Sequence, residues 1–350
     1  MARVFVAMSG GVDSSVAAAR LVEAGHDVVG VTMQLLPSGD AEGGCCSTTA
    51  VRDARRTCDA LGIPHYTLNV RDAFRREVVD DFCDEYANGR TPNPCIRCND
   101  RIKFAELWRR ARLQGAEFLA TGHYARVARD GEGAPWLARG LDSAKDQSYF
   151  LYRMTPEQLE RTLFPVGELT KSEVRGIARA LALPAAAVRE SQEVCFVPGD
   201  CDAASFVKAQ RPRAATPGPI LDSSGRALGT HAGIAGYTVG QRRGLRIGAG
   251  TPLYVLGVDA GRNAVVAGPA ESLDVREAVC RDAVWRGPAD APVDAQVRYR
   301  QQAVRALARF TGEQLLLRFR APLRGVAPGQ AAVCYKEGVV LGGGVVEEAR

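Results

Sequence analysis

The sequence predicts an α/β protein in which a parallel-sheet domain is followed by two small β-rich domains. Over residues 1–120, short apolar runs alternate with amphipathic helical segments, a pattern typical of a parallel sheet with helices on both faces. After about residue 205, the chain changes to short β-like runs separated by glycine and proline. This second pattern favours small barrels or sandwiches.

These changes in pattern place the domain boundaries. We expect a first domain over residues 1–205, with a helical extension from about residue 150, and further domains over residues 206–270 and 271–350. Proline-containing sequence at residues 210–217 and at Pro269 marks the two boundaries. Within the helical extension, the spacing of Thr170 and Glu173 predicts a capping box.

The individual elements follow from apolar periodicity and from the glycine and proline residues that end each run. In the first domain, the predicted strands cover residues 4–8, 28–32, 66–70 and 117–121. The predicted helices cover residues 14–24, 48–61, 71–88, 101–114 and 154–183. In the later domains, the predicted strands cover residues 220–221, 227–228, 254–258, 264–267, 296–299, 315–319, 331–335 and 339–341.

The segment Ser9-Gly10-Gly11-Val12-Asp13-Ser14-Ser15 directly follows the first predicted strand. Its two glycines allow a tight turn, and the helix that follows directs backbone N–H groups toward one point, which suits a phosphate group. The segment has neither the lysine of a P-loop nor the three glycines of a dinucleotide fingerprint. Met33 and the turn Thr121-Gly122-His123 also follow predicted strands, so we expect them to line one crevice with this loop.

Residues 89–99 form a second distinctive segment, in which two prolines stiffen a loop that carries Cys95 and Cys98. We expect Cys98 to lie just before a helix that begins near Asp100, where the helix N-terminus and neighbouring arginines favour a thiolate. A C-x-x-C pair also serves zinc and redox sites, so a zinc site stays open. Cys195, taken by itself, is most simply a buried core thiol.

Composition limits the compartment and the partners. Ten cysteines do not suit a disulfide framework in a reducing cell, and no apolar run reaches the length of a membrane span or a signal peptide. We therefore expect a cytoplasmic protein that does not bind membranes, and we expect it to be monomeric. The net charge of +5 is too small to establish a nucleic-acid partner.

The loop at residues 9–15 resembles that of the ATP pyrophosphatases, which carry an adenine-nucleotide alpha-hydrolase-like (PP-loop) domain and split ATP into AMP and pyrophosphate. The chain as a whole resembles one family of this N-type superfamily, the tRNA-specific 2-thiouridylases. These enzymes replace the C2 oxygen of the wobble uridine with sulfur. The resemblance rests on Ala7 to Ser15, Met33, Gly89 to Pro94, Cys98-Asn99, Thr121 to Arg126, Lys145 to Phe150, His231 to Gly233, Tyr237 to Arg242, Val297 to Gln301, Pro328 to Gln330 and Gly342 to Val346.

The resemblance implies roles for individual residues. ATP would be bound by Ala7, Met8, Ser9, Gly10, Gly11, Val12, Asp13, Ser14, Met33 and Gly122. The flipped-out target base would be approached by Asn93, Pro94 and Cys95. The tRNA would be contacted by His123, Lys145, Asp146, Gln147, Arg298, Tyr299 and Gln330. Cys98 would be the nucleophile and Cys195 the persulfide carrier, and the two would form a transient disulfide.

The resemblance also implies the reaction and its partners. ATP adenylates the C2 oxygen of the wobble uridine, and sulfur transfer then gives 2-thiouridine, AMP and pyrophosphate. Mg²⁺ would accompany ATP, with Asp13 as a candidate ligand, although a carboxylate at this position can equally stabilise the helix N-terminus. The partners would be the tRNA anticodon loop and a sulfur donor, such as a cysteine desulfurase or a relay protein.

Three alternatives stay open at the level of the sequence. Cys95 stands where many relatives carry Asp, so Cys95, Cys98 and Cys195 could together hold a [4Fe–4S] cluster with one open iron for sulfide. A ligase that adenylates a small metabolite would account for the loop at residues 9–15 but not for the cysteines. A non-catalytic tRNA-binding metal protein would account for the cysteines but not for that loop.

Overall fold

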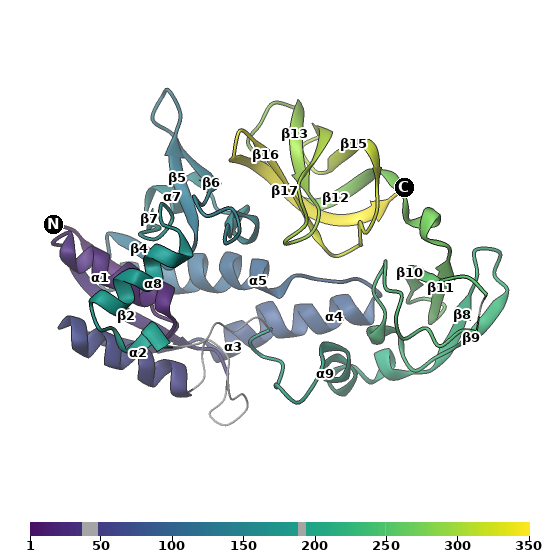
Figure 1. The fold of residues 1–350 in the computed structure, drawn as a ribbon, viewed down its shortest axis with the longest axis horizontal. Helices are drawn as coiled ribbons and strands as arrows, with labels where there is room; N and C mark the ends of the chain where they lie inside the picture. Colours follow the sequence, from purple (N-terminus) through teal and green to yellow (C-terminus); the bar gives the residue numbers. More distant parts are fainter. Residues whose placement is uncertain (37–47, 188–193, 249) are drawn as a thin grey trace. The chain divides into compact units, whose positions relative to one another are not determined.

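The computed structural model describes residues 1–36, 48–187, 194–248 and 250–350 (Figure 1). These residues divide into two compact units. The first unit contains Met1–Val79, Cys95–Asp200 and Gly338–Val340, and the second contains Asp80–Pro94, Cys201–Glu337 and Leu341–Arg350. The division into three domains at residues 205 and 270 stays a prediction.

A five-stranded sheet forms the centre of the first unit, and all its pairings are parallel. Its strand order is β3-β2-β1-β4-β7. The strands are β1 (Arg3–Ala7), β2 (Asp27–Gln34), β3 (His65–Asn69), β4 (Phe118–Thr121) and β7 (Thr162–Leu163). The predicted parallel sheet of an α/β domain is therefore confirmed.

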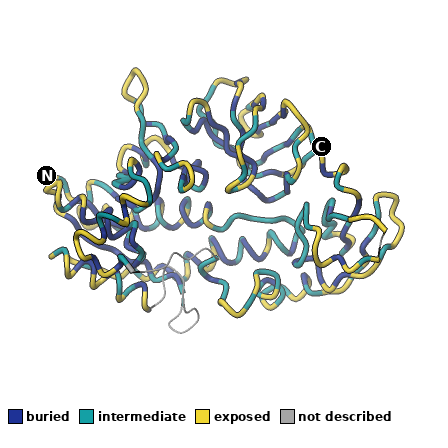
Figure 2. The backbone as a smooth tube through the Cα atoms, viewed as in Figure 1, coloured by how far each residue is buried: buried dark blue, intermediate teal, exposed yellow. Residues whose placement is uncertain are grey.

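Apolar side chains from three helices complete the core of this unit. The helices are α1 (Val12–Glu23), α2 (Thr48–Leu61) and α8 (Lys171–Ala180). Val4 and Val6 of β1 pack with side chains of α1 and α2, while another set of α1 side chains packs against α8. Strands β1, β2 and β4 are mostly buried, whereas the edge strand β3 is not; Figure 2 shows burial along the chain. Helix α1 is thus held on two sides, which fixes the position of its N-terminus.

The helical segments between β3 and β4 differ from the prediction in one important respect. They are α3 (Arg71–Phe74), a π-helix (Arg75–Asp80), α4 (Asp81–Ala87), α5 (Pro94–Arg97), a second π-helix (Cys98–Leu107) and α6 (Trp108–Leu113). The helix expected to begin near Asp100 begins at Pro94 instead. Proline fits the first position of a helix because its φ angle is already helical and its missing N–H is not needed there.

The predicted helical extension over residues 154–183 is only partly correct. It contains α7 (Pro156–Glu160) and α8, but β7 lies between them and pairs with β4. A strand of two residues has no periodicity of its own and is defined by its neighbour in the sheet. The capping box of Thr170 and Glu173 is confirmed. The hairpin of β5 (Ala125–Arg129) and β6 (Pro135–Arg139) was not predicted.

The second unit contains two β structures. A four-stranded sheet has the order β10-β11-β8-β9, and six further strands, in the order β12-β15-β14-β13-β16-β17, close on themselves through a β12–β17 pairing. The strands of this four-stranded sheet are β8 (Gly218–Leu221), β9 (Ala227–His231), β10 (Tyr254–Asp259) and β11 (Ala264–Gly268). The barrel strands are β12 (Val275–Trp285), β13 (Asp290–Gln296), β14 (Val304–Phe310), β15 (Leu315–Leu323), β16 (Ala331–Lys336) and β17 (Val339–Ala349).

Two features of the barrel differ from the sequence prediction. The strand expected over residues 296–299 is wrong, because β13 ends at Gln296 and the next residues form a turn. Strands β12 and β14 were missed, as was β13 apart from its last residue. In β14, the exposed residues Arg305, Leu307 and Arg309 alternate with the small buried residues Ala306 and Ala308. Alanine carries little of the β signal that valine and isoleucine provide.

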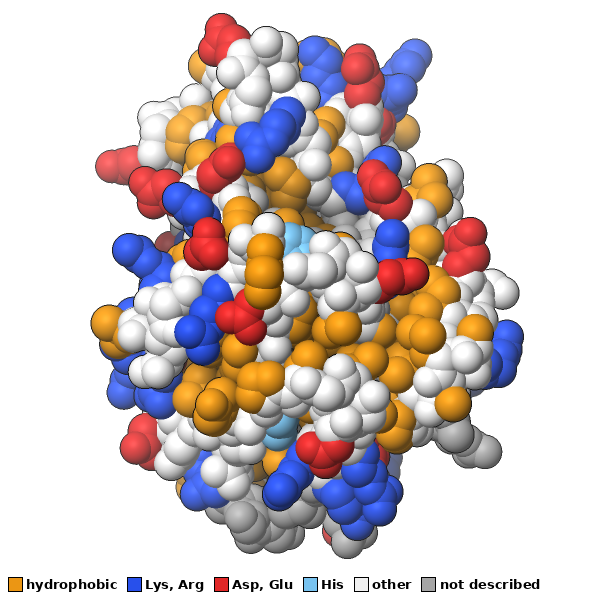
Figure 3. Space-filling view, turned by 90° about the vertical axis from the view of Figure 1, so that its left-hand side faces the viewer, with side chains coloured by type: hydrophobic (Ala, Val, Ile, Leu, Met, Phe, Trp, Pro, Cys, Tyr) orange, Lys and Arg blue, Asp and Glu red, His pale blue; other side chains and the backbone are white. Residues whose placement is uncertain are grey.

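Short helices and the surface complete the description. The remaining helices are α9 (Ala203–Gln210) and the 3₁₀ turns Ser148–Leu151, Pro184–Ala187, Pro212–Ala215, Ile234–Gly236 and Ala270–Leu273. Within the described ranges, no helix is both long enough and apolar enough to cross a membrane. Figure 3 shows basic and acidic side chains interspersed on one face, in keeping with the net charge of +5.

Burial divides the cysteines into two kinds. Cys58 and Cys280 are fully enclosed. Burial raises the pKa of the Cys58 thiol to about 11 and that of Cys280 to about 12. Cys334 is buried near Cys280, and burial likewise raises its pKa. Cys95, in contrast, is exposed. The enclosed thiols are core residues that stay protonated at neutral pH.

This difference predicts the pattern of thiol alkylation. A short pulse of iodoacetamide on the native protein should label Cys95 and leave Cys58, Cys280 and Cys334 unlabelled, because the reagent needs an accessible thiolate. Peptide mass spectrometry measures the labelling at each position, and a pulse after unfolding in urea provides the fully labelled control. Rapid native labelling of Cys280 would contradict the burial described above.

Candidate nucleotide and sulfur-transfer site

The carboxyl ends of three neighbouring strands meet at one edge of the parallel sheet. Ala7, at the end of β1, pairs with Val31 of β2 on one side and with Thr121 of β4 on the other. The Met8 N–H group donates to the Val31 carbonyl at 2.8 Å. The loop after β1, the end of β2 and the turn after β4 therefore share one edge, as the sequence predicts.

Serine side chains fold the loop between β1 and α1. The hydroxyl groups of Ser14 and Ser15 donate to the Gly11 carbonyl at 3.1 and 3.0 Å, and the Ser9 N–H donates to Ser14 Oγ at 3.2 Å. Gly10 has a φ of +73°, a conformation that glycine adopts without strain. Because the Ser14 and Ser15 hydroxyl groups bind the loop itself, backbone N–H groups at the start of α1 are the main donors left for a phosphate.

Gly122 packs directly against the N-terminus of α1. A Cβ atom added to Gly122 would lie 2.5 Å from the Ser14 nitrogen and 2.6 Å from the Asp13 carbonyl carbon. No side chain fits at these distances unless the backbone moves. The turn after β4 thus touches the first turn of α1, which places Gly122 next to the loop as the ATP-binding prediction requires.

Asp13 is engaged by two residues that the sequence analysis did not single out. Lys171 Nζ lies 2.7 and 2.8 Å from the two carboxylate oxygens, and the Tyr124 hydroxyl donates to one of them at 2.7 Å. Across the described ranges, no three His, Cys, Asp or Glu side chains lie close enough together to hold a metal ion. The role of Asp13 as a Mg²⁺ ligand stays a prediction.

Cys95 and Cys98 lie in different environments on the same helical segment. Cys95 is in the first turn after Pro94 and is exposed, whereas Cys98 begins the π-helix and is only 9% exposed. The expectation that Cys98 precedes a helix is wrong, because the helix has already begun. The cluster held by Cys95, Cys98 and Cys195 stays a prediction.

Cys195 lies in a turn that an aromatic contact anchors. Phe196 is buried, and its ring packs edge-to-face on Phe74 of α3 with 5.8 Å between the ring centroids. Cys195 itself is half-buried. Helix α3 also packs against the π-helix that begins at Cys98. The pairing of Cys98 with Cys195 stays a prediction.

The predicted tRNA-contacting residues of the first unit already have internal partners. His123 is buried against Phe104 and Phe164 and lies 2.8 Å from Thr121 Oγ1. Burial, aided by the charge of Lys103, holds the pKa of His123 well below its usual value, so the imidazole is neutral at pH 7. The predicted contact between His123 and tRNA stays a prediction.

Asp146 organises the turn that follows the β5–β6 hairpin. Its carboxylate pairs with Arg139 at 2.7 Å and accepts hydrogen bonds from the Gly140 N–H and from both the N–H and the hydroxyl group of Ser148. Gln147 Oε1 accepts from the Tyr124 N–H at 3.0 Å. Asp146 and Gln147 thus stabilise the conformation of this turn. Lys145, in the same turn, is half-buried.

In the second unit, the predicted tRNA contacts Arg298 and Tyr299 lie in the turn after β13. Arg298 is exposed and Tyr299 is half-buried, and the Arg300 guanidinium lies 5.6 Å from the Tyr299 ring centroid. An arginine–tyrosine surface of this kind suits phosphates and unstacked bases.

The loop that carries the predicted target-base residues Asn93 and Pro94 is held by the turn before β16. The Gln330 amide donates to the Thr91 carbonyl at 2.7 Å, and the Thr91 N–H donates to the Pro328 carbonyl at 2.8 Å. Gly329, with a φ of +91°, leaves no room for a Cβ beside Thr91. Gln330 therefore holds this loop in the described structure, and its predicted contact with tRNA stays a prediction.

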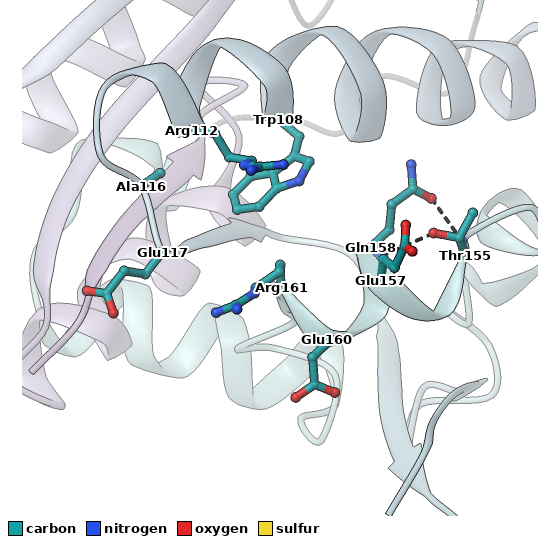
Figure 4. A pocket seen from close by; sticks show the side chains of 9 residues that line it. All are labelled: Trp108, Arg112, Ala116, Glu117, Thr155, Glu157, Gln158, Glu160 and Arg161. Atoms are coloured by element: carbon teal, nitrogen blue, oxygen red, sulfur yellow. Dashed lines mark hydrogen bonds between the residues drawn. The ribbon is translucent and has the colours of Figure 1, made fainter.

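A separate cavity of about 840 Å³ lies at the opposite edge of the parallel sheet (Figure 4). Trp108 and Arg112 of α6 line it, together with Glu117 before β4 and Arg161 at the end of α7. Because β4 runs parallel to β1, a cavity at the amino end of β4 is remote from the loop at residues 9–15. This cavity is not part of the nucleotide site.

Comparison with known families covers nearly the whole chain. A family model described as the tRNA methyl transferase HUP domain matches residues 2–199. Models described as the tRNA methyl transferase PRC-barrel domain and the aminomethyltransferase beta-barrel domain match residues 204–269 and 277–346.

Relatives named tRNA-specific 2-thiouridylase are similar over almost their full lengths. The protein of Geobacter metallireducens is 48% identical, with 99% of this chain and 97% of its own length covered. The protein of Acidothermus cellulolyticus is 50% identical, with 99% and 98% covered. That of Moorella thermoacetica is 49% identical, with 98% of each chain covered. This chain belongs to the tRNA-specific 2-thiouridylase family.

Solved structures are more distant from this thiouridylase family member. A 4-thiouridine synthetase in complex with RNA and ATP is 19% identical, with 55% of this chain and 44% of that chain covered, at a TM-score of 0.37. NMN synthetase from Francisella tularensis is 18% identical, with 54% and 66% covered, at a TM-score of 0.33. TM-scores at this level do not establish a common fold.

The turn around Asp146 yields the first testable prediction for this site. Asp146→Ala should lower the free energy of unfolding of the first unit by about 2–4 kcal/mol, because it leaves the Arg139 guanidinium and the Ser148 groups without their acceptor. Thermal unfolding without tRNA measures the loss. Ser143→Ala, at an exposed position of the same turn, is the matched control and should unfold at the wild-type temperature. Wild-type stability of Asp146→Ala would contradict the structural role.

The hydrogen bond between Gln330 and Thr91 yields the second testable prediction. Gln330→Ala removes the amide donor, so the backbone of residues 90–93 should exchange its amide hydrogens faster in the tRNA-free protein. Hydrogen–deuterium exchange with mass spectrometry measures the effect. Gln314→Ala, on an exposed turn of the same barrel, is the control. Unchanged exchange in Gln330→Ala would show that the loop does not depend on this bond.

Proposed function

We propose that this protein is an ATP-dependent tRNA-uridine 2-sulfurtransferase that makes 2-thiouridine at the wobble position. The observation that carries the proposal is near-complete coverage by thiouridylase relatives at 48–50% identity, together with a phosphate-suited loop at the end of β1. The same coverage supports tRNA as the substrate and ATP as the co-substrate.

The first chemical step makes the uridine oxygen a leaving group. The C2 carbonyl is a poor electrophile, and oxide does not leave. Attack of O2 on the α-phosphorus of ATP forms an O2–P bond, breaks the bond to the bridging oxygen and releases pyrophosphate. Backbone N–H groups at the start of α1 would stabilise the charge that develops on pyrophosphate. Mg²⁺ would enter with the nucleotide.

The second step supplies sulfur from a persulfide on Cys195. The Cys98 thiolate attacks the Cys195 sulfur of that persulfide and releases hydrosulfide, which adds to C2 and expels AMP. The two cysteines end as a disulfide, which an external thiol reductant must reduce before the next cycle. A protein that carries sulfane sulfur, such as a cysteine desulfurase or its relay, reloads Cys195.

The target base must leave the anticodon stack to reach this chemistry. Unstacking costs a few kcal/mol and is cheapest in a single-stranded loop. We assign the approach to the base to Asn93, Pro94 and Cys95, and contacts along the tRNA to Arg298 and Tyr299. We place the reaction in the cytoplasm with ATP and tRNA.

An iron–sulfur route is the second candidate mechanism, and the observation that favours it is Cys95 three residues before Cys98. Protein purified without oxygen separates the two routes. The persulfide route predicts protein with negligible iron and no broad visible absorption that nevertheless thiolates tRNA when a persulfide donor is added. Stoichiometric iron and acid-labile sulfide, lost together with activity on chelation, would replace the persulfide route.

The central test of the proposal measures thiolation by variants of the two cysteines. Cys98→Ser and Cys195→Ser should each reduce 2-thiouridine formation to background, because each removes one sulfur of the transfer, while tRNA binding persists. Nucleoside mass spectrometry of the tRNA measures the product, and Cys201→Ser is the matched control with thiolation retained.

The same assay distinguishes the metabolite ligase. Under our proposal, release of pyrophosphate from ATP requires tRNA. Release that is driven by a small metabolite and is indifferent to tRNA would refute the sulfurtransferase assignment. Normal thiolation by Cys195→Ser would refute the carrier role of Cys195.

A further inference from the structure

The loop at residues 9–15 carries an acidic residue and no cation, although its proposed ligand is a polyphosphate. A P-loop supplies a lysine from its own sequence to pair with the phosphates. Here the chain instead brings Lys171 to the loop from 158 positions away. The lysine that is missing from the local sequence is thus present in the folded site.

Lys171 is positioned at the start of α8 by backbone and side-chain bonds. Thr170 and Glu173 form the capping box that begins the helix, and the Lys171 N–H donates to Asp142 Oδ2 at 3.0 Å. Helix α8 packs against α1. The Cα of Lys171 is therefore fixed relative to the loop, and only its side chain needs to move in order to change partner.

The ammonium group of Lys171 lies at the N-terminus of α1. It is 2.7 and 2.8 Å from the two oxygens of Asp13, the second residue of that helix, and 5.7 Å from the Tyr124 ring centroid. The side chain is 12% exposed, and that of Asp13 is 30% exposed. The ammonium is thus within reach of the place where the backbone N–H groups would receive phosphate.

The charges explain why the pair is useful before the nucleotide arrives. A carboxylate beside a polyphosphate repels it, and a partly enclosed ammonium without a counter-ion is costly. Pairing the two keeps the empty site neutral. When a pyrophosphate group enters, its oxygens offer Lys171 a stronger partner than a single carboxylate, while the Tyr124 hydroxyl continues to bind Asp13.

We propose that Lys171 is the cation that binds the pyrophosphate portion of ATP in this protein, and that Asp13 holds it in place while the site is empty. This inference rests on the proposed use of ATP. As the bond between the α-phosphorus and the bridging oxygen breaks, negative charge grows on the departing pyrophosphate. An ammonium at this position stabilises that charge in the transition state as well as in the bound state.

Nucleotide binding without tRNA tests the proposal separately from thiolation. Lys171→Met should weaken the binding of ATP and of pyrophosphate by about 10- to 100-fold, the value of a charged hydrogen bond, while changing AMP binding less than about twofold. Lys171→Arg should recover part of the loss. Lys208→Met, in the second unit, is the matched control and should bind ATP as the wild type does. Isothermal titration calorimetry measures all four proteins.

A double variant separates direct contact from charge compensation. If Lys171 only neutralised Asp13, Asp13→Asn combined with Lys171→Met would restore wild-type ATP affinity, and the proposal would be overturned. We expect the double variant to stay weak for ATP and pyrophosphate. Equal loss of AMP and ATP affinity in Lys171→Met and Lys171→Arg would also overturn the proposal, since it would indicate a structural role.

The outcomes also distinguish this inference from the proposed function. Wild-type protein that binds ATP through Lys171 but forms no thiouridine would leave the inference standing and refute the sulfurtransferase assignment. Wild-type protein that binds no ATP would overturn both.

Discussion

The contact between Gly122 and the first turn of α1 is the constraint on which the nucleotide site depends. An atom at the Cβ position of Gly122 would lie 2.5 Å from the Ser14 nitrogen, so the turn after β4 and the start of α1 touch through backbone alone. Parallel pairing of β1 with both β2 and β4 produces this approach. Packing of α1 against α2 and α8 then keeps the N-terminus of the helix in place.

The packing of the first unit also determines which charged groups lie near the start of α1 and which cysteines are buried. Helix α8 brings Lys171 to Asp13, and Tyr124 follows the Gly122 turn closely enough to bind the same carboxylate. Burial keeps Cys58, Cys280 and Cys334 protonated within the cores. The cysteines to which our proposal assigns sulfur chemistry lie on the helix after Pro94 and in the turn beside Phe196; among them, Cys95 is exposed and Cys195 is half-buried.

The second unit contributes a rigid support for the loop before Pro94. Glu85 of α4 accepts hydrogen bonds from both Arg90 and Arg281, and the Pro328–Gln330 turn binds Thr91 on both its N–H and its carbonyl. These bonds limit the movement of the loop to which our proposal assigns the approach to the target base, because both backbone groups of Thr91 are engaged.

The sequence by itself determined the α/β class, the loop at residues 9–15, the β-rich character of the second half and the family resemblance. Each of these rests on residues that are close together in the chain, where periodicity and turn chemistry act directly. Sequence reasoning placed the helix around Cys98 too late and missed β7 and the β5–β6 hairpin. Only the tertiary structure paired Lys171 with Asp13 and Gln330 with Thr91. Contacts between residues so far apart in the chain depend on the order of strands and the packing of helices, which no local pattern encodes.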